Sequence, residues 1–286
     1  MDIFLVEAMV NGLLLGGVFA LLTIGLNLIF GVIGVIWIAY TELVMVGMYT
    51  IYCLYTGVGF PLLVACLVTV VFVTALGALV HFLIIAPILD APPINQLLAT
   101  GGLMLFLQSL ATLIFTTDFR NIGVRLPSLK VGGMFIGTAR LLAFIVALIA
   151  VVCLYLFLKH TFWGLAIRAI AQDRHIIGLM GIDQRLAYGI TSAIGGALAG
   201  LAACLLVLQY DVQPFIGLSF GPIVWMNCVF GGLGNLVGGF LSAFVLSEII
   251  AISDEPETLA LARIPLRLPQ TVPEWLSPIP AIIPGQ

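Results

Sequence analysis

Few side chains in this 286-residue chain have the type and spacing that chemistry requires. The two lysines are Lys130, in the sequence PSLKV, and Lys159, in LFLKH, and neither follows a glycine. A phosphate-cradling GxxxxGK[ST] loop is therefore missing, so if ATP is used, another polypeptide hydrolyses it. No Ser/His/Asp or Cys/His arrangement is apparent, and the three histidines are scattered. We predict no catalytic residue, no bound cofactor and no metal site in this chain.

A few polar side chains stand inside or at the edge of long apolar stretches. A carboxylate within a membrane is costly and by default suggests a function, whereas one at the end of a span is hydrated at the interface. For Glu248 we favour the interface, and for Glu42, beside a glycine-rich stretch, both interpretations stay open. For Asn27, Gln108 and Asn227 we favour hydrogen bonding between helices over contact with a substrate.

The stretch 162–185, FWGLAIRAIAQDRHIIGLMGIDQR, is of mixed polarity and lies between two apolar blocks. Its spacing predicts a helix over about 165–180 that ends at Gly181, because glycine readily takes the position after a helix C-terminus. Ile177 and Met180 fall on one side of this helix. It is either an interfacial helix on the lipid surface or a docking element for a soluble partner.

The composition of the chain, 62% hydrophobic and 8% charged, indicates which kind of secondary structure positions these residues. Soluble domains carry roughly 25% charged residues, so this composition indicates a membrane protein. Backbone polar groups in hydrocarbon must be bonded within their own segment, which predicts helices. Eight apolar blocks are candidates for these helices: 4–30, 36–56, 61–86, 96–117, 139–159, 186–209, 219–233 and 236–252. The expected fold class is all-α, a polytopic transmembrane helix bundle of about eight segments over residues 1–252.

Two of the segments contain interruptions. Residues 25–42 hold three glycines and end in a polar triplet, and residues 211–222 hold two prolines around two glycines. Broken segments occur where backbone is buried in protein or lines a cavity, and an ordinary loop or a packing face is the alternative. Residues 253–286 hold seven of the fourteen prolines, which predicts an extended, proline-rich tail that does not span.

The distribution of charge bears on topology and partners. Loops 118–140 and 159–185 each carry four Lys or Arg residues and lie on opposite sides of one span, so the positive-inside rule does not orient the chain. An acidic N-terminus, with Asp2 and Glu7, mildly favours an external start. A net charge of −3 with no basic cluster argues against nucleic acid, and lipid is the expected surrounding.

Three stretches resemble one known family. RAIAQDRHIIGLMGI (168–182) resembles the cytoplasmic loop of permeases from ABC importers for branched-chain amino acids and related amides, where R-A-x-x-Q-[ND]-x-x-x-A-x-x-x-G-I recurs. GLLLGGVFALLTIGLNLIFGVIGVI (12–36) and VFGGLGNLVGGFLSAFVLSE (229–248) resemble membrane segments of that family. The resemblance implies a multi-pass permease subunit in the inner membrane of a bacterium. The resemblance also implies transport by alternating access, with loop 160–185 as a cytoplasmic coupling loop.

The resemblance also implies partners. The coupling helix would sit in a groove of an ATP-binding subunit and transmit closure of the ATPase dimer, so ATP is used by the partner and not by this chain. A second permease subunit, forming a heterodimer, and a periplasmic or extracellular solute-binding protein are expected. The residues assigned to ATPase coupling are Arg168, Gln172, Asp173, Arg174, Ile177, Met180, Gly181 and Ile182.

The chain departs from the family pattern in two places. Family members commonly read I-N-F-A-H-G-E after the first segment, and here residues 36–42 read IWIAYTE, so the glutamate stays and aromatic residues enter. These replacements would narrow a path or suit a more apolar solute. The candidate substrate-path residues are Asn27, Trp37, Tyr40, Thr41, Glu42 and Asn227. Members also usually end with one more spanning helix, where this chain has its proline-rich tail.

Two other interpretations stay open. An ion- or proton-coupled secondary transporter would need titratable groups within the membrane, for which Glu42, Glu248 and His81 are the candidates. An incomplete permease that lacks its last helix would also show such a tail.

Overall fold

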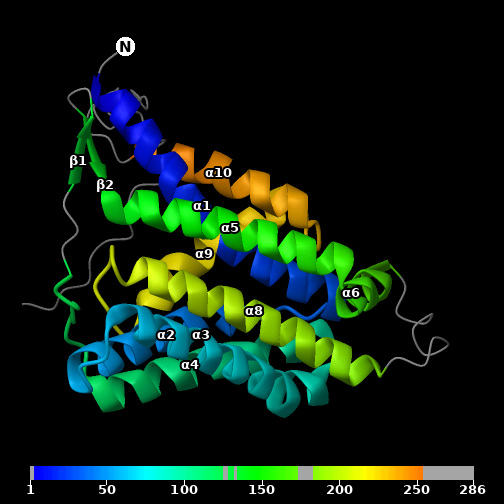
Figure 1. Ribbon diagram of the computed structural model, residues 1–286. Coiled ribbons are helices and arrows are strands. Elements are labelled where there is room, and N and C mark those ends of the chain that lie inside the picture. Colours follow the sequence, from blue (N-terminus) through cyan, green and yellow to red (C-terminus); the bar gives the residue numbers. More distant parts are fainter. Residues whose placement is uncertain (1–2, 125–127, 132–133, 173–182, 254–286) are drawn as a thin grey trace, which may run out of the picture.

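A computed structural model describes residues 3–124, 128–131, 134–172 and 183–253 (Figure 1). The first half contains α1 (Ile3–Ile33), a 3₁₀ turn (Ile38–Thr41), α2 (Glu42–Tyr52), a π turn (Cys53–Gly57), α3 (Leu62–Val80), a π turn (His81–Ile85), a 3₁₀ turn (Ala86–Ile88) and α4 (Pro93–Phe115). The second half contains β1 (Ser128–Val131), β2 (Met134–Gly137), α5 (Thr138–His160), α6 (Phe162–Gln172), α8 (Gln184–Leu206), α9 (Ile216–Gly231) and α10 (Leu236–Ser253).

The helices confirm the expected bundle. Among the described residues, seven helical stretches are long and apolar enough to cross a membrane, and α9, of 16 residues, is a shorter apolar helix. Together they match the eight apolar blocks of the sequence. The bundle is polytopic and α-helical, with a short antiparallel hairpin of β1 and β2 added in the loop before α5. Loop 118–140 was not expected to contain strands, although its sequence places Gly132 and Gly133 between them, a pair favoured in tight hairpin turns.

Two helices form the centre of the bundle. α1 and α8 are largely enclosed, whereas most of α3, α4, α5 and α10 faces outward. α1 runs along α10, and α3 runs along α8 (Figure 1). A Cβ atom on Gly77 of α3 would come within 3.0 Å of the Cα of Gly196 on α8, so these two backbones touch as small-residue membrane interfaces do.

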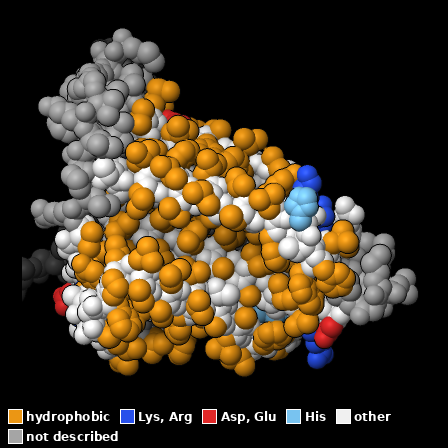
Figure 2. Space-filling view, in the orientation of Figure 1, with side chains coloured by type: hydrophobic (Ala, Val, Ile, Leu, Met, Phe, Trp, Pro, Cys, Tyr) orange, Lys and Arg blue, Asp and Glu red, His pale blue; other side chains and the backbone are white. Residues whose placement is uncertain are grey.

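The outside of the bundle is suited to lipid. Figure 2 shows apolar side chains over the middle of the visible face and most of the charged ones toward its ends. Leu63, Phe106, Leu113 and Val245 are among the large apolar side chains that are more than half exposed. Such a belt is unfavourable in water and favourable in hydrocarbon.

The two interruptions differ from each other. α1 continues to Ile33, Gly34 then takes a positive φ of 73°, and the 3₁₀ turn follows before α2 begins at Glu42. The second interruption is shorter than expected, because it ends at Ile216 and Pro222 lies inside α9. A proline in a membrane helix is tolerated where neighbouring groups satisfy the freed backbone.

Candidate substrate path

Residues 34–42 join α1 to α2 and lie inside the bundle. Trp37, Tyr40 and Glu42 are all 0% exposed, although the segment is not a regular α-helix. The Trp37 and Tyr40 rings meet edge to face, with centroids 6.0 Å apart. Trp37 Nε1 has no hydrogen-bond partner within the described part of the chain. Of the two interpretations that the sequence left open for this stretch, the structure therefore supports an interruption buried in protein.

Tyr40 joins the two central helices. Its hydroxyl donates a hydrogen bond to the carbonyl oxygen of Gly195 on α8, at 3.1 Å. The same hydroxyl lies against Gly25 of α1, where a Cβ atom would collide with it. Tyr40 therefore fills the space that Gly25 leaves open on α1 and bonds to the backbone of α8.

Glu42 and Thr41 face the other helices. Gln108 of α4 donates from Nε2 to Oε1 of Glu42 at 2.7 Å, and both side chains are buried. The Glu42 carboxyl group rests on Gly217 of α9, because a Cβ there would lie 2.5 Å from Oε1. Thr41 rests in the same way on Gly221, at 3.1 Å from its Oγ1. The second carboxyl oxygen of Glu42 has no partner among the described residues.

The two asparagines of the predicted path have different surroundings. Asn27 donates to the carbonyl oxygen of Asn235 and accepts from the Gly234 amide, both at 3.2 Å, so its side chain holds the turn between α9 and α10. Asn227 is 0% exposed, and neither its amide nitrogen nor its side-chain oxygen has a described partner. Contact of either residue with substrate stays a prediction.

The structure adds residues to this site that sequence reasoning did not assign to it. Gln108 was noted as a polar residue in an apolar block, and it does bond across helices, but nothing in the sequence indicated Glu42 as its partner. Gly195, Gly217 and Gly221 are the surfaces on which the polar side chains rest. A chain with 31 glycines gives no local signal that these three matter.

The expected coupling surface is described in part. α6 begins after Thr161, whose hydroxyl accepts from the Gly164 amide at 3.0 Å, and it buries Ile167 and Ile170 against the bundle. Arg168 and Gln172 are on its exposed side. The other predicted coupling residues lie outside the described residues: Asp173, Arg174, Ile177, Met180, Gly181 and Ile182.

α6 is also attached to the centre of the bundle. It contacts α5, and it reaches both α1 and α8, the two helices that Tyr40 joins. α6 therefore contacts both helices that border the buried segment.

These features define the class of protein: a polytopic helical permease, with a buried polar segment inside the bundle and an amphipathic helix between two spans. The chain belongs to the family of branched-chain amino acid transport system permease components, whose model matches residues 8–254. It is thus a multi-pass inner-membrane permease subunit of the ABC importer type.

The names of similar proteins also describe branched-chain amino acid transport permeases. The chain is 29% identical over 255 residues to the high-affinity branched-chain amino acid transport system permease protein BraD of Pseudomonas aeruginosa, over 84% of this chain and 83% of that protein. It is 29% identical over 270 residues to the corresponding protein LivH of Escherichia coli K12, over 88% and 86%. A probable LivH of Methanocaldococcus jannaschii is 27% identical over 58% of this chain. No solved structure matches the chain.

Proposed function

We propose that this chain forms part of the translocation path for branched-chain amino acids or related small amino acids and amides, together with a second permease subunit. Partner ATPases drive it, a solute-binding protein delivers the substrate, and this chain itself binds no cofactor. The family and the names of its relatives support the substrate class. The aromatic side chains Trp37 and Tyr40 suit a solute with an apolar side chain.

The observation that carries the mechanism is the contact of α6 with both α1 and α8. When the ATPases close, the coupling loop moves α6, and α6 moves the ends of these helices relative to each other. Tyr40 lies between them, and within the described part of the chain its hydroxyl bonds to α8 alone. A relative shift of α1 and α8 opens the packing around Trp37, Tyr40 and Glu42, which are closed to solvent in this conformation. Substrate then passes from one side to the other by alternating access.

A co-purification experiment tests the coupling. The full chain is co-expressed with its partner subunits, and the amount of ATPase that purifies with it is measured for Arg168→Glu and for Arg174→Glu. Arg140→Glu is the matched control, because Arg140 is exposed, as Arg168 is, but lies at the opposite end of α5. We expect the first two variants to lose the ATPase and the control to keep it. Retention of the ATPase by both coupling variants would contradict the proposal.

Uptake into proteoliposomes separates this function from a secondary transporter. In the proposed importer, leucine uptake requires ATP and the solute-binding protein, and its rate does not change when a proton or sodium gradient is imposed. In a coupled secondary transporter, uptake follows the gradient without ATP, and Glu42→Gln removes it. Gradient-driven uptake in the absence of ATP would overturn the importer mechanism.

A further inference from the structure

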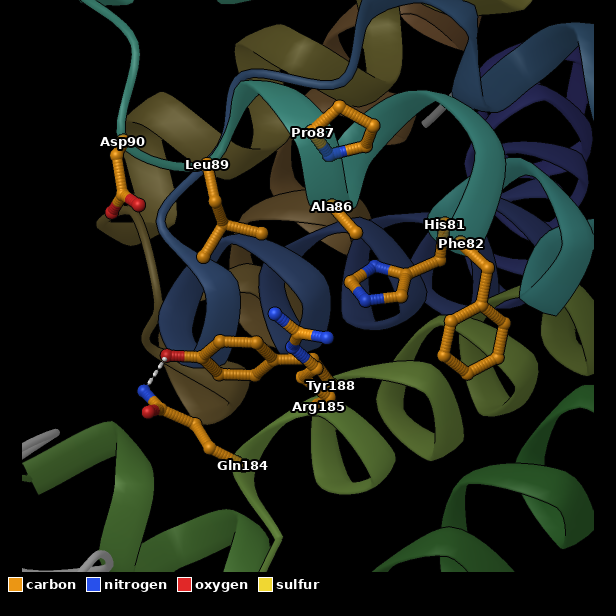
Figure 3. Close-up of a pocket in the computed structure, with 9 residues that line it drawn as sticks. All are labelled: His81, Phe82, Ala86, Pro87, Leu89, Asp90, Gln184, Arg185 and Tyr188. Carbon is orange, nitrogen blue, oxygen red and sulfur yellow. Dashed lines mark hydrogen bonds between the residues drawn. The ribbon is translucent and has the colours of Figure 1, made fainter.

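A polar cavity of about 510 Å³ opens where the end of α3 meets the start of α8. It is lined on one wall by the segment 81–90 and on the other by the first turn of α8 (Figure 3). Ligand cavities for small molecules are roughly 300–1,000 Å³, so its size admits a free amino acid.

The cavity is on the same side of the membrane as the coupling loop. α5 ends at His160 on that side, so its start and the end of α4 are on the other. α4 therefore begins on the coupling side, and the segment 81–90 precedes it there. α8 begins on the same side, at Gln184. The cavity faces the cytoplasm if the coupling loop does.

Its two walls carry opposite charges. Asp90 lies on the first wall, and Arg185 extends from α8 into the space between the walls (Figure 3). No ion pair joins these two side chains, and neither has another charged partner within the described part of the chain. An unpaired carboxylate and an unpaired guanidinium on facing walls suit a ligand that carries both charges.

Two further residues line the cavity beside the charged groups. The His81 ring is 1% exposed and its Nδ1 is closed to solvent, so the ring is part of the wall. Tyr188 accepts a hydrogen bond from Gln184 Nε2 at 2.6 Å, which leaves its own hydroxyl proton free to donate.

The walls are held in place by their own hydrogen bonds. Gln96 of α4 is buried, and its Nε2 is within hydrogen-bond distance of the carbonyl oxygens of Ile88, Leu89 and Ala91, so it fixes the turn that carries Asp90. Asp183 caps α8 by accepting from the Arg185 amide at 2.9 Å. Such supported walls favour binding, because little conformational freedom is lost when a ligand enters.

The rest of the lining is apolar. Phe82, Ala86, Pro87 and Leu89 line the cavity beside the charged groups. They form the surface that an aliphatic side chain would contact.

From this juxtaposition we propose that the cavity is a second amino-acid site, in which Arg185 binds the carboxylate and Asp90 the ammonium group of an α-amino acid with an aliphatic side chain. Tyr188 completes its polar contacts, and Leu89 and Pro87 contact the side chain. The cytoplasmic position of the site rests on the proposed function. The site takes imported product on the cytoplasmic side, next to the coupling loop.

Binding to the purified complex tests the site. The full chain with its partner subunits is placed in lipid nanodiscs without the solute-binding protein, and calorimetry measures the affinity for leucine, 4-methylpentanoate and 3-methylbutylamine. We expect leucine to bind about tenfold or more tightly than either analogue, since each analogue leaves one wall charge unpaired. Arg185→Gln should lower leucine affinity to that of the amine, and Asp90→Asn should lower it to that of the acid.

Two control variants and an uptake measurement separate failure of this site from failure of the proposed function. Arg140→Gln and Asp118→Asn change exposed charges at the other end of the bundle and should leave leucine affinity unchanged. ATP-driven uptake by the same variants, reconstituted into proteoliposomes with the solute-binding protein, shows that each variant is folded and assembled. If leucine does not bind to a complex that transports it, or if both wall variants bind leucine like the wild type, the site is wrong and the proposed function stands. If uptake does not need ATP, the proposed function fails independently of any binding here.

Discussion

Oε1 of Glu42 accepts a hydrogen bond of 2.7 Å from Gln108 Nε2, and the two residues are 66 positions apart in the sequence. The bond joins the start of α2 to the middle of α4 at a point where both side chains are closed to solvent. It supplies a partner to one oxygen of a buried carboxyl group, and Gly217 leaves room for that group. The polar interior of this permease therefore depends on a contact between helices that are distant in the chain.

Removal of Gln108 should destabilise the protein. Gln108→Ala leaves the Glu42 carboxyl without its described partner, which costs about 1–3 kcal/mol of unfolding free energy. Thermal unfolding in nanodiscs measures the effect. Asn95→Ala is the matched control, because Asn95 is an exposed amide on the same helix and its side chain makes no described hydrogen bond. Equal melting temperatures for the two variants would contradict a stabilising role for the Glu42–Gln108 bond.

A methyl group on Gly217 should disturb the same site from the other side. Gly217→Ala places a Cβ atom 2.5 Å from Oε1 of Glu42, and either the carboxyl group or α9 must move. We expect ATP-driven leucine uptake to fall at least about tenfold, at a stability loss of about 1–3 kcal/mol. Gly101→Ala is the control, since no heavy atom lies within 4 Å of a Cβ there. Because Gly101 lies within a helix, alanine there should preserve uptake and raise the free energy of unfolding by about 0.5–1 kcal/mol.

The Tyr40 hydroxyl offers a test of the contact between α1 and α8. Tyr40→Phe removes its bond to the Gly195 carbonyl and keeps the ring, so we expect a loss of about 0.5–1.5 kcal/mol. We also expect a change in the ATPase rate that substrate stimulates, because α6 contacts both of the helices that Tyr40 joins. Tyr155→Phe is the control, because Tyr155 is 60% exposed on α5. An unchanged stimulation ratio in Tyr40→Phe would argue against coupling through this contact.

The topology predicts opposite labelling of two loops. In a background without the five native cysteines, Asp90→Cys should react with a membrane-impermeant maleimide only from the cytoplasmic side. Asp118→Cys should react only from the outside, because α4 separates the two positions. Maleimide labelling of right-side-out and of inside-out vesicles shows from which side of the membrane each cysteine reacts. Labelling of both cysteines from one side would overturn the assignment of α4 as a spanning helix.

Several local features were predictable because their causes are local. The apolar block 139–159 corresponds to α5, Thr138–His160, because the thickness of the membrane and the hydropathy of the residues decide both. The helix predicted over about 165–180 is present in its described part: α6 begins three residues earlier, at Phe162, and is described to Gln172. Its predicted end at Gly181 lies outside the described residues. The break after the first segment was visible in its glycines, and Gly34 does take a positive φ. In contrast, Pro222 looked like a helix breaker but lies within α9, since the bundle around it decides whether a helix tolerates a proline.

The sequence by itself determined that this chain is a helical membrane protein, and its motifs indicated the permease family. The length of each apolar block, the glycines that interrupt a block and the loop motif at 168–182 can each be recognised within a few tens of residues. Only the tertiary structure decided that Gln108 bonds Glu42, that Tyr40 lies between Gly25 and Gly195, and that Asp90 and Arg185 face one cavity. The physical reason is that helix packing in lipid is set by close contacts of small residues and a few polar groups, and the sequence does not state which surfaces meet.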